Sequence, residues 1–335
     1  MSSLAKQLEL FQLQLFRYEL PFILGIGIIG NFINIIIFGR RTLRKNMCSW
    51  YFICLAVAHL FLLTFSCLPR IISALTGFDL SGRSLAFCKF RAYAIDASLA
   101  LARHFLCLVA IDRWLITSSS LEIRNQSSPR ITRRVIVGSF IFWSLFNIHV
   151  PIKYDIGRLG CSPPLGTSYE LVYSIYNITA SMVPMFIMSL FTILAVRNLR
   201  LRMRNRIQPQ PITTGSGATP MTKSSNVTTQ QLRQSRRDGQ LIRLSILQVV
   251  AFLILNTMRG IFPLYSFLMN SRGNLTADDR SLLLFFSGFG NNLLFTYAAN
   301  TFLLYTLASK TFRAECLNVF ERYISIVKQR LEAMF

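Results

Sequence analysis

Two short groups of residues lie at opposite ends of one apolar segment. Cys88 precedes the segment and Asp112-Arg113-Trp114 ends it, with 25 residues separating Cys88 from Arg113. The stretch between them, 89–110, is long enough to cross a bilayer as a helix. A cysteine that faces an oxidising compartment can form a disulfide, and an arginine at helix depth needs a charged partner or water. The two groups therefore mark opposite faces of a membrane.

Composition also predicts a membrane protein. Hydrophobic residues make up 52% of the 335 residues, charged residues make up 15%, and the mean hydropathy is +0.44. A soluble domain carries roughly 25% charged residues. Seven apolar stretches are long enough to be transmembrane helices. They cover residues 18–38, 49–68, 87–116, 135–151, 171–196, 241–268 and 281–307.

The net charge of +22 is distributed unevenly along the chain. With seven spans, the two termini lie on opposite sides of the membrane. If the N-terminus is outside, the inner segments hold more than twice as many Lys and Arg residues as the outer segments. The positive-inside rule therefore predicts a plasma-membrane protein with an extracellular N-terminus and a cytoplasmic C-terminus. The basic excess then sets topology and attracts anionic lipid, and no motif for binding nucleic acid accompanies it.

Several residues in these spans match one family of membrane proteins. In chain order they are Gly30-Asn31, Leu55-Ala56-Val57-Ala58-His59-Leu60, Trp143, Pro184 and Phe312-Arg313. Together with Asp112-Arg113-Trp114 and an extracellular N-terminus, this pattern resembles the rhodopsin-like class of G-protein-coupled receptors. The resemblance extends over about 18–323.

The resemblance implies an all-α integral membrane protein, a bundle of seven helices with a short amphipathic eighth helix. It implies an extracellular N-terminus (1–17), a transmembrane domain (18–307), and an amphipathic helix with a cytoplasmic tail (308–335). The intracellular loop at about 207–232 is rich in Pro, Thr, Ser, Gln and Gly, which predicts disorder.

The resemblance also implies the functional residues. Cys88 and Cys161 are expected to form a disulfide on the outer side. In the resting state Arg113 is held by Asp112 and by a second acid at the base of the sixth helix, for which Asp238 is the candidate. Once released, Arg113 lines a cavity for a heterotrimeric G protein, with arrestin as a second cytoplasmic partner. Residues expected to pack around this switch are Asn31, His59, Trp143, Pro184 and Phe252.

The sixth helix departs from the family pattern. If Asp238 sets the register, Phe252 takes the family's phenylalanine position, Asn256 takes the tryptophan position, and the kinking proline is missing. If Pro263 sets the register, Ile261 takes the tryptophan position. We prefer the first register because it accounts for both Asp238 and Phe252.

The seventh helix departs too. The family's Asn-Pro-x-x-Tyr appears as Asn300-Thr301-Phe302-Leu303-Leu304-Tyr305, without the proline and with one extra residue. Counting back from Phe312 keeps Tyr305 in the tyrosine position and puts Thr301 in place of the asparagine. The resemblance implies that Tyr305 belongs to the coupling switch and swings toward Arg113 or a water between them, with an aromatic residue at the inner membrane interface as the alternative. In the second helix His59 replaces the sodium-binding aspartate, and imidazole is a poor ligand for a hard cation, so no metal or other cofactor is expected.

Four residues are candidates for the ligand pocket, namely Ile95, Asp96, Arg259 and Asn292. Receptors of this class that bind amines place an aspartate where Ile95 stands, so a ligand ammonium has no partner there. The seventh helix contains no lysine, which excludes a retinal Schiff base. By elimination, the extracellular ligand is expected to be a neuropeptide, amidated or partly acidic, with a small molecule as the alternative.

Two modification sites and two other functions complete the expectations. Asn274 lies in an outer glycosylation sequon, and Cys316 beside the amphipathic helix is a palmitoylation candidate. No arrangement of nucleophile, base and acid indicates an enzyme. The competing functions are a transporter or channel, and a seven-helix receptor that no longer couples to a G protein.

Overall fold

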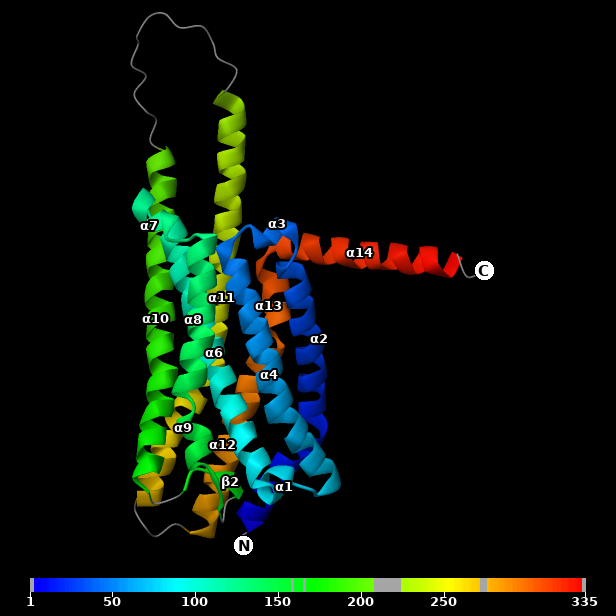
Figure 1. The fold of residues 1–335 in the computed structure, drawn as a ribbon, viewed down its shortest axis with the longest axis vertical. Helices are drawn as coiled ribbons and strands as arrows, with labels where there is room; N and C mark the ends of the chain where they lie inside the picture. Colours follow the sequence, from blue (N-terminus) through cyan, green and yellow to red (C-terminus); the bar gives the residue numbers. More distant parts are fainter. Residues whose placement is uncertain (1–2, 158–159, 165–166, 208–223, 272–275, 333–335) are drawn as a thin grey trace, which may run out of the picture.

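The computed structural model describes residues 3–157, 160–164, 167–207, 224–271 and 276–332. Long helices lie side by side in a bundle, and a C-terminal helix projects from one end of it (Figure 1). In chain order the elements are α1 (Ser3–Gln14), the π-helical turn η1 (Leu15–Glu19), α2 (Leu20–Phe38), α3 (Arg41–Arg44), α4 (Met47–Thr76), α5 (Leu80–Arg83), α6 (Leu85–Thr117), α7 (Leu121–Asn125), α8 (Pro129–Phe146), α9 (His149–Lys153), β1 (Asp155–Gly157), β2 (Gly160–Ser162), α10 (Ser168–Ile207), α11 (Ser224–Ser271), α12 (Ala277–Ala299), α13 (Thr301–Ala308) and α14 (Lys310–Glu332). We call the end with the N-terminus and the β1–β2 hairpin the hairpin end, and the opposite end the α14 end.

Local sequence signals set the helix boundaries at the hairpin end. The hydroxyl of Ser84 accepts a hydrogen bond from the Phe87 amide and so caps the start of α6. Thr276 and Asp279 form a reciprocal capping box at the start of α12, and these hydrogen bonds lower the pKa of Asp279. Helix α4 stops at Gly77, whose φ of 69° suits a residue without a Cβ atom.

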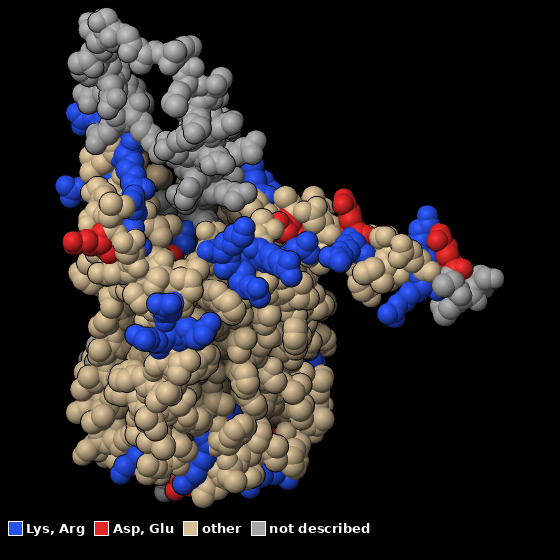
Figure 2. Space-filling model, turned by 45° about the horizontal axis from the view of Figure 1, so that its top comes forward, with Lys and Arg blue, Asp and Glu red and all other residues tan. Residues whose placement is uncertain are grey.

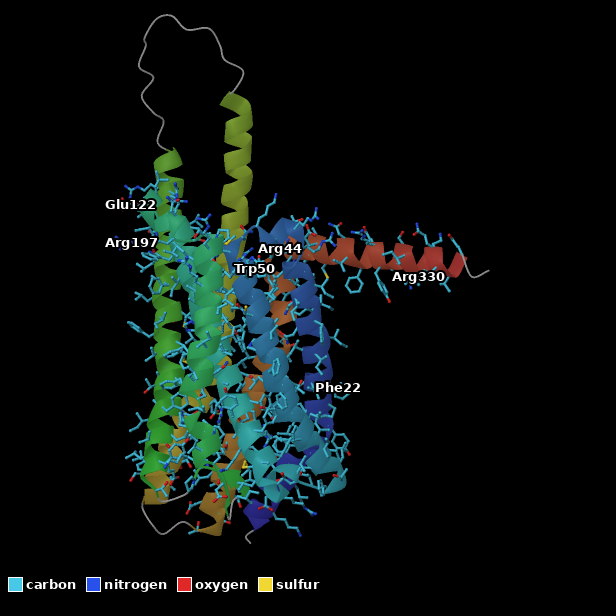
Figure 3. All side chains as sticks on the ribbon, in the orientation of Figure 1. Phe22, Arg44, Trp50, Glu122, Arg197 and Arg330 are labelled. Carbon is cyan, nitrogen blue, oxygen red and sulfur yellow. A yellow bond between two sulfur atoms is a disulfide. The ribbon has the colours of Figure 1, made fainter. Side chains whose placement is uncertain are left out.

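The surface of the bundle is suited to lipid. Within the described part of the chain, six helices are long and apolar enough to cross a membrane, and α11 runs beside them as a further helix of the bundle. Large apolar side chains are exposed on the helices, among them Phe22, which points away from the bundle (Figure 3). Phe22 is 73% exposed and Phe186 is 70% exposed. Figure 2 shows basic side chains gathered near the α14 end above a broad surface without charge. The chain is therefore a multi-pass membrane protein.

The predicted spans correspond to the helices, with three differences. The first span continues without a break back to Lys6, through η1 into α1. Helix α11 begins at Ser224, inside the range for which composition predicts disorder, because several good helix formers precede its apolar part. The predicted eighth helix is not short. It is α14, with 23 residues, and it leaves the bundle at a steep angle.

Two buried clusters form the interior. The cluster at the α14 end contains the stacked rings of Phe38 and Phe52, with Tyr305 and Phe312 against them. The other cluster lies toward the hairpin end and joins α2, α4, α6 and α12, with Leu63 among its members. Helix α6 contributes to both clusters, and it also buries polar side chains, among them Asp96 and Arg113.

Gly27 lies where α2, α4 and α12 meet, and its replacement by alanine should destabilise the protein. A Cβ atom there would collide with the end of Leu63 and lie 3.1 Å from Cβ and 3.3 Å from Cα of Ala299. Overpacking of this kind costs about 1–3 kcal/mol. We expect Gly27→Ala to lower the melting temperature of the protein purified in detergent. Gly25→Ala is the matched control, because a Cβ atom at Gly25 meets nothing within 4 Å and alanine favours the helix. Equal melting temperatures for the two variants would contradict this packing.

Candidate functional site

A disulfide ties the hairpin to the bundle. Cys88 at the start of α6 is bonded to Cys161 in β2, with 5.6 Å between their Cα atoms. In the hairpin Cys161 lies opposite Ile156, so the bond fixes both strands against α6. The disulfide predicted from the family resemblance is confirmed.

A cavity of about 250 Å³ opens beside this disulfide. Of the four predicted ligand-contact residues, Ile95, Asp96 and Arg259 line it. The asparagine on its wall is Asn291 rather than Asn292, because neighbouring helical residues point about 100° apart. Asn292 is buried elsewhere in the bundle, and within the described residues its side-chain amide has no hydrogen-bond partner.

A chain of hydroxyl groups ends on Asp96 in this cavity. Tyr154 donates to the hydroxyl of Tyr173 at 2.8 Å, and Tyr173 donates to Oδ2 of Asp96 at 2.6 Å. Burial raises the pKa of Tyr154, so its hydroxyl keeps its proton at neutral pH and remains a donor. Sequence reasoning missed both tyrosines, which come from the loop after α9 and from α10. The chain from Tyr154 through Tyr173 to Asp96 depends on how α6, α10 and the loop after α9 are arranged in space, which the sequence does not give.

At the α14 end, α6 presents a buried ion pair. Nη2 of Arg113 lies 2.6 Å from Oδ2 of Asp112, and the Arg113 side chain is 2% exposed. The other oxygen of Asp112 accepts a hydrogen bond of 2.6 Å from Ser127, in the loop after α7. Close by, Arg202 of α10 donates to the Ser118 carbonyl, which ties α10 to the end of α6. The Asp112 carboxylate thus holds Arg113 and the following loop together.

Tyr305 is linked to α11 rather than to Arg113 through the contacts described. Its hydroxyl accepts a hydrogen bond of 2.9 Å from Nε2 of Gln248, and both side chains are buried. Gln248 was not among the predicted residues, since one polar residue in an apolar helix gives no sign of its partner. The bond joins the sixth and seventh helices of the bundle at the α14 end.

The seventh span is broken at Asn300 although it lacks the family's proline. Asn300 ends α12 and caps α13, and its Nδ2 bonds to the Thr296 carbonyl at 2.8 Å. Next to it, Thr301 donates to Oδ1 of Asn31 and accepts from Nδ2 of Asn34, each at 3.3 Å. These polar contacts to α2 support the break in place of proline.

The family model for the 7 transmembrane receptor (rhodopsin family) matches residues 30–290, which include both ends of α6 and most of the bundle. The chain belongs to this receptor family. The resemblance inferred from the motifs is therefore confirmed.

The remaining packing residues of the receptor lie within or against the bundle. His59 is buried with its ring 5.8 Å from that of Tyr297, and the ring of Phe252 lies 5.3 Å from that of Tyr297. Trp143 is half-buried and packs edge-on to Phe146. The carbonyl of Pro184 in α10 lies 3.7 Å from the Cys107 sulfur. His59 and Phe252 thus both contact the buried Tyr297.

Three other predicted residues of the receptor remain as predictions. The side chain of Asp238 lies outside the described residues, and so does Asn274. Cys316 lies on the buried face of α14, in the same cluster as Phe312 of that helix and Phe38 of α2, and burial raises the pKa of its thiol. An acyl chain on Cys316 would require that face of α14 to turn away from the bundle.

Proposed function

We propose that the receptor lies in the plasma membrane with its hairpin end outside and its α14 end in the cytosol. In this orientation it binds an extracellular ligand in the cavity beside the disulfide. The first candidate for the ligand is a neuropeptide, and the second is a small molecule. It then activates a heterotrimeric G protein through Asp112 and Arg113. The positive-inside rule supports the orientation, because the basic side chains gather at the α14 end. There Arg44 lies over the ring of Trp50, as residues at a membrane interface do (Figure 3).

One observation carries the proposal: helix α6 bears both a cavity residue and the buried ion pair. Asp96 and Arg113 are separated by 17 residues of one helix, or about 26 Å along its axis. A ligand that favours one position of α6, α10 and α11 at the outer end changes which contacts are available at the inner end. Release of Arg113 from Asp112 would expose a guanidinium to the G protein, and arrestin would use the same surface. Anionic lipid at the inner leaflet would bind the basic residues around it.

Replacement of Arg113 by alanine tests the proposal. We expect G-protein nucleotide exchange in receptor-containing membranes, stimulated by a library of short peptides, to fall at least tenfold. Each hydrogen bond to a charged group contributes about 1.5–3 kcal/mol, and the alanine variant removes every hydrogen bond that the Arg113 guanidinium makes. Arg330→Ala is the control, since Arg330 is exposed near the far end of α14 (Figure 3). Measurements should be compared at equal surface expression.

Three outcomes would contradict coupling through Arg113. Undiminished exchange in Arg113→Ala membranes would place the switch elsewhere. Peptide-independent solute flux that survives the substitution would favour the transporter or channel. A folded surface receptor that stimulates no G protein in either form would favour a receptor that has lost coupling.

A further inference from the structure

The cavity at the hairpin end is lined by three arginines from three different helices. Arg70 comes from α4, Arg91 from α6 and Arg259 from α11. A fourth, Arg103, lies two turns below Asp96 on α6 and is only 4% exposed. Asp96 is the one acidic residue on the wall of the cavity as described. Positive charge therefore exceeds negative charge on the wall of this cavity.

None of these arginines has a carboxylate within ion-pair distance in the part of the chain that the structure describes. The salt bridges there are Arg40–Glu315, Arg113–Asp112 and Lys328–Glu332. Asp96, the nearby acid, already accepts a short hydrogen bond from Tyr173.

The contacts that the cavity arginines do make are with neutral groups. Arg91 donates to the Phe65 carbonyl at 2.9 Å and to the Ser81 hydroxyl at 3.1 Å. Arg70 lies over the Phe295 ring at 5.4 Å, and Nε of Arg259 has no hydrogen-bond partner among the described residues. These contacts position the guanidinium groups. The nearby carboxylates are Asp96 on the cavity wall and Asp79 in the adjoining hollow, and neither forms a salt bridge with Arg70, Arg91 or Arg259 among the described residues.

Such a cluster is costly unless an anion completes it. The side chains of Arg70, Arg91 and Arg259 are half-buried. Charges withdrawn from water are usually paired, and ionisable groups inside a membrane protein mark binding sites or relays. A guanidinium presents a planar fork of donors that matches a carboxylate, and such pairs are among the strongest hydrogen bonds in proteins. The cluster thus has the donors for an anionic group and lacks the anion.

We propose that the receptor's ligand carries a carboxylate, which Arg70, Arg91 and Arg259 bind inside this cavity. The inference rests on the proposed function, and it names the chemistry of the ligand. With about 250 Å³, the cavity takes one acidic end of a ligand rather than a whole peptide. A second hollow of about 290 Å³ shares Arg70, Arg91 and Cys161 with it and extends to Leu13 and Phe16 near the N-terminus. The body of a peptide with a free C-terminus or an acidic side chain has room there. A small organic acid offers the same anionic group.

Matched pairs of carboxylates and amides test the inference. The probes are a panel of N-acetyl dipeptides, each as the free acid and as the C-terminal amide, together with short organic acids and their amides. The measurement is the thermal unfolding of the full receptor purified in detergent, without G protein. It is repeated for Arg91→Gln, Arg259→Gln and the control Arg83→Gln. Arg83 lies at the same end but is exposed, stacks on Phe78, and does not line the cavity.

We expect free acids to raise the melting temperature by a few degrees near saturation, and their amides to do so much less. Arg91→Gln and Arg259→Gln should weaken the acid's apparent affinity by about tenfold to a hundredfold, whereas Arg83→Gln should leave it unchanged. Acid-specific shifts confined to dipeptides would indicate a peptide ligand, and shifts confined to organic acids would indicate a small molecule.

Equal shifts for acid and amide in every pair, or no acid-specific shift in any pair, would overturn the proposal. So would an acid-specific shift that persists in both arginine variants. Because no G protein is present, failure here leaves the Arg113 test of coupling unaffected, and a failure of coupling leaves this binding result intact.

Discussion

Replacing Cys88 with serine is expected to lower the stability of the receptor by about 4 kcal/mol. The disulfide with Cys161 joins positions 73 residues apart. A crosslink that closes a loop of this size lowers the conformational entropy of the unfolded chain and so stabilises the folded receptor. The hairpin would also be released from α6, and with it the Tyr154 hydroxyl that reaches Tyr173. We expect the melting temperature of the purified receptor to fall by roughly 10 °C and its surface expression to drop sharply.

Two further variants make this result specific. Cys161→Ser should match Cys88→Ser, and the double variant should add little, because all three lose the same bond. Cys54→Ser is the control, since Cys54 is a half-buried free thiol in α4. A melting temperature that changes no more in Cys88→Ser than in Cys54→Ser would contradict the account of the hairpin.

Replacing Asp112 with asparagine is expected to raise signalling in the absence of ligand. The carboxylate is the acid that lies 2.6 Å from Arg113, and it also binds Ser127. Loss of its charge weakens interactions worth about 1.5–3 kcal/mol, which shifts a two-state equilibrium by about tenfold to a hundredfold. Basal nucleotide exchange should therefore rise. The melting temperature should fall, because Arg113 stays buried with its partner neutralised.

Ser127→Ala is the matched control for Asp112→Asn. It removes the hydrogen bond from the loop to Asp112 and leaves the ion pair intact, so basal exchange should rise less than in Asp112→Asn. If basal exchange is the same in the unsubstituted receptor and in Asp112→Asn, the ion pair does not restrain the receptor.

The sequence predicted the spans well because each lipid-facing helix needs a long apolar stretch. It also placed Asp96 and Arg113 on one helix at opposite ends, since their spacing along α6 is fixed by helical geometry. The disulfide came from the family resemblance, because seven cysteines allow many pairings.

Contacts between residues far apart in the chain could not be predicted from the sequence. Gln248 and Tyr305 are 57 residues apart, and their hydrogen bond depends on how α11 and α13 are rotated. Asn291 and Asn292 could not be distinguished because a shift of one residue turns a side chain by about 100°. The break at Asn300 was missed because its support comes from Asn31 and Asn34 on another helix, not from a local proline.

The central claim is that the cavity near Cys161 and the Asp112–Arg113 pair face opposite sides of one membrane. Epitope tags at the two termini, labelled by antibodies in intact and then in permeabilised cells, test this directly. The account predicts labelling of the N-terminal tag in intact cells and of the C-terminal tag only after permeabilisation. Both tags reacting in intact cells, or neither, would contradict an odd number of crossings and with it the proposed path from ligand to G protein.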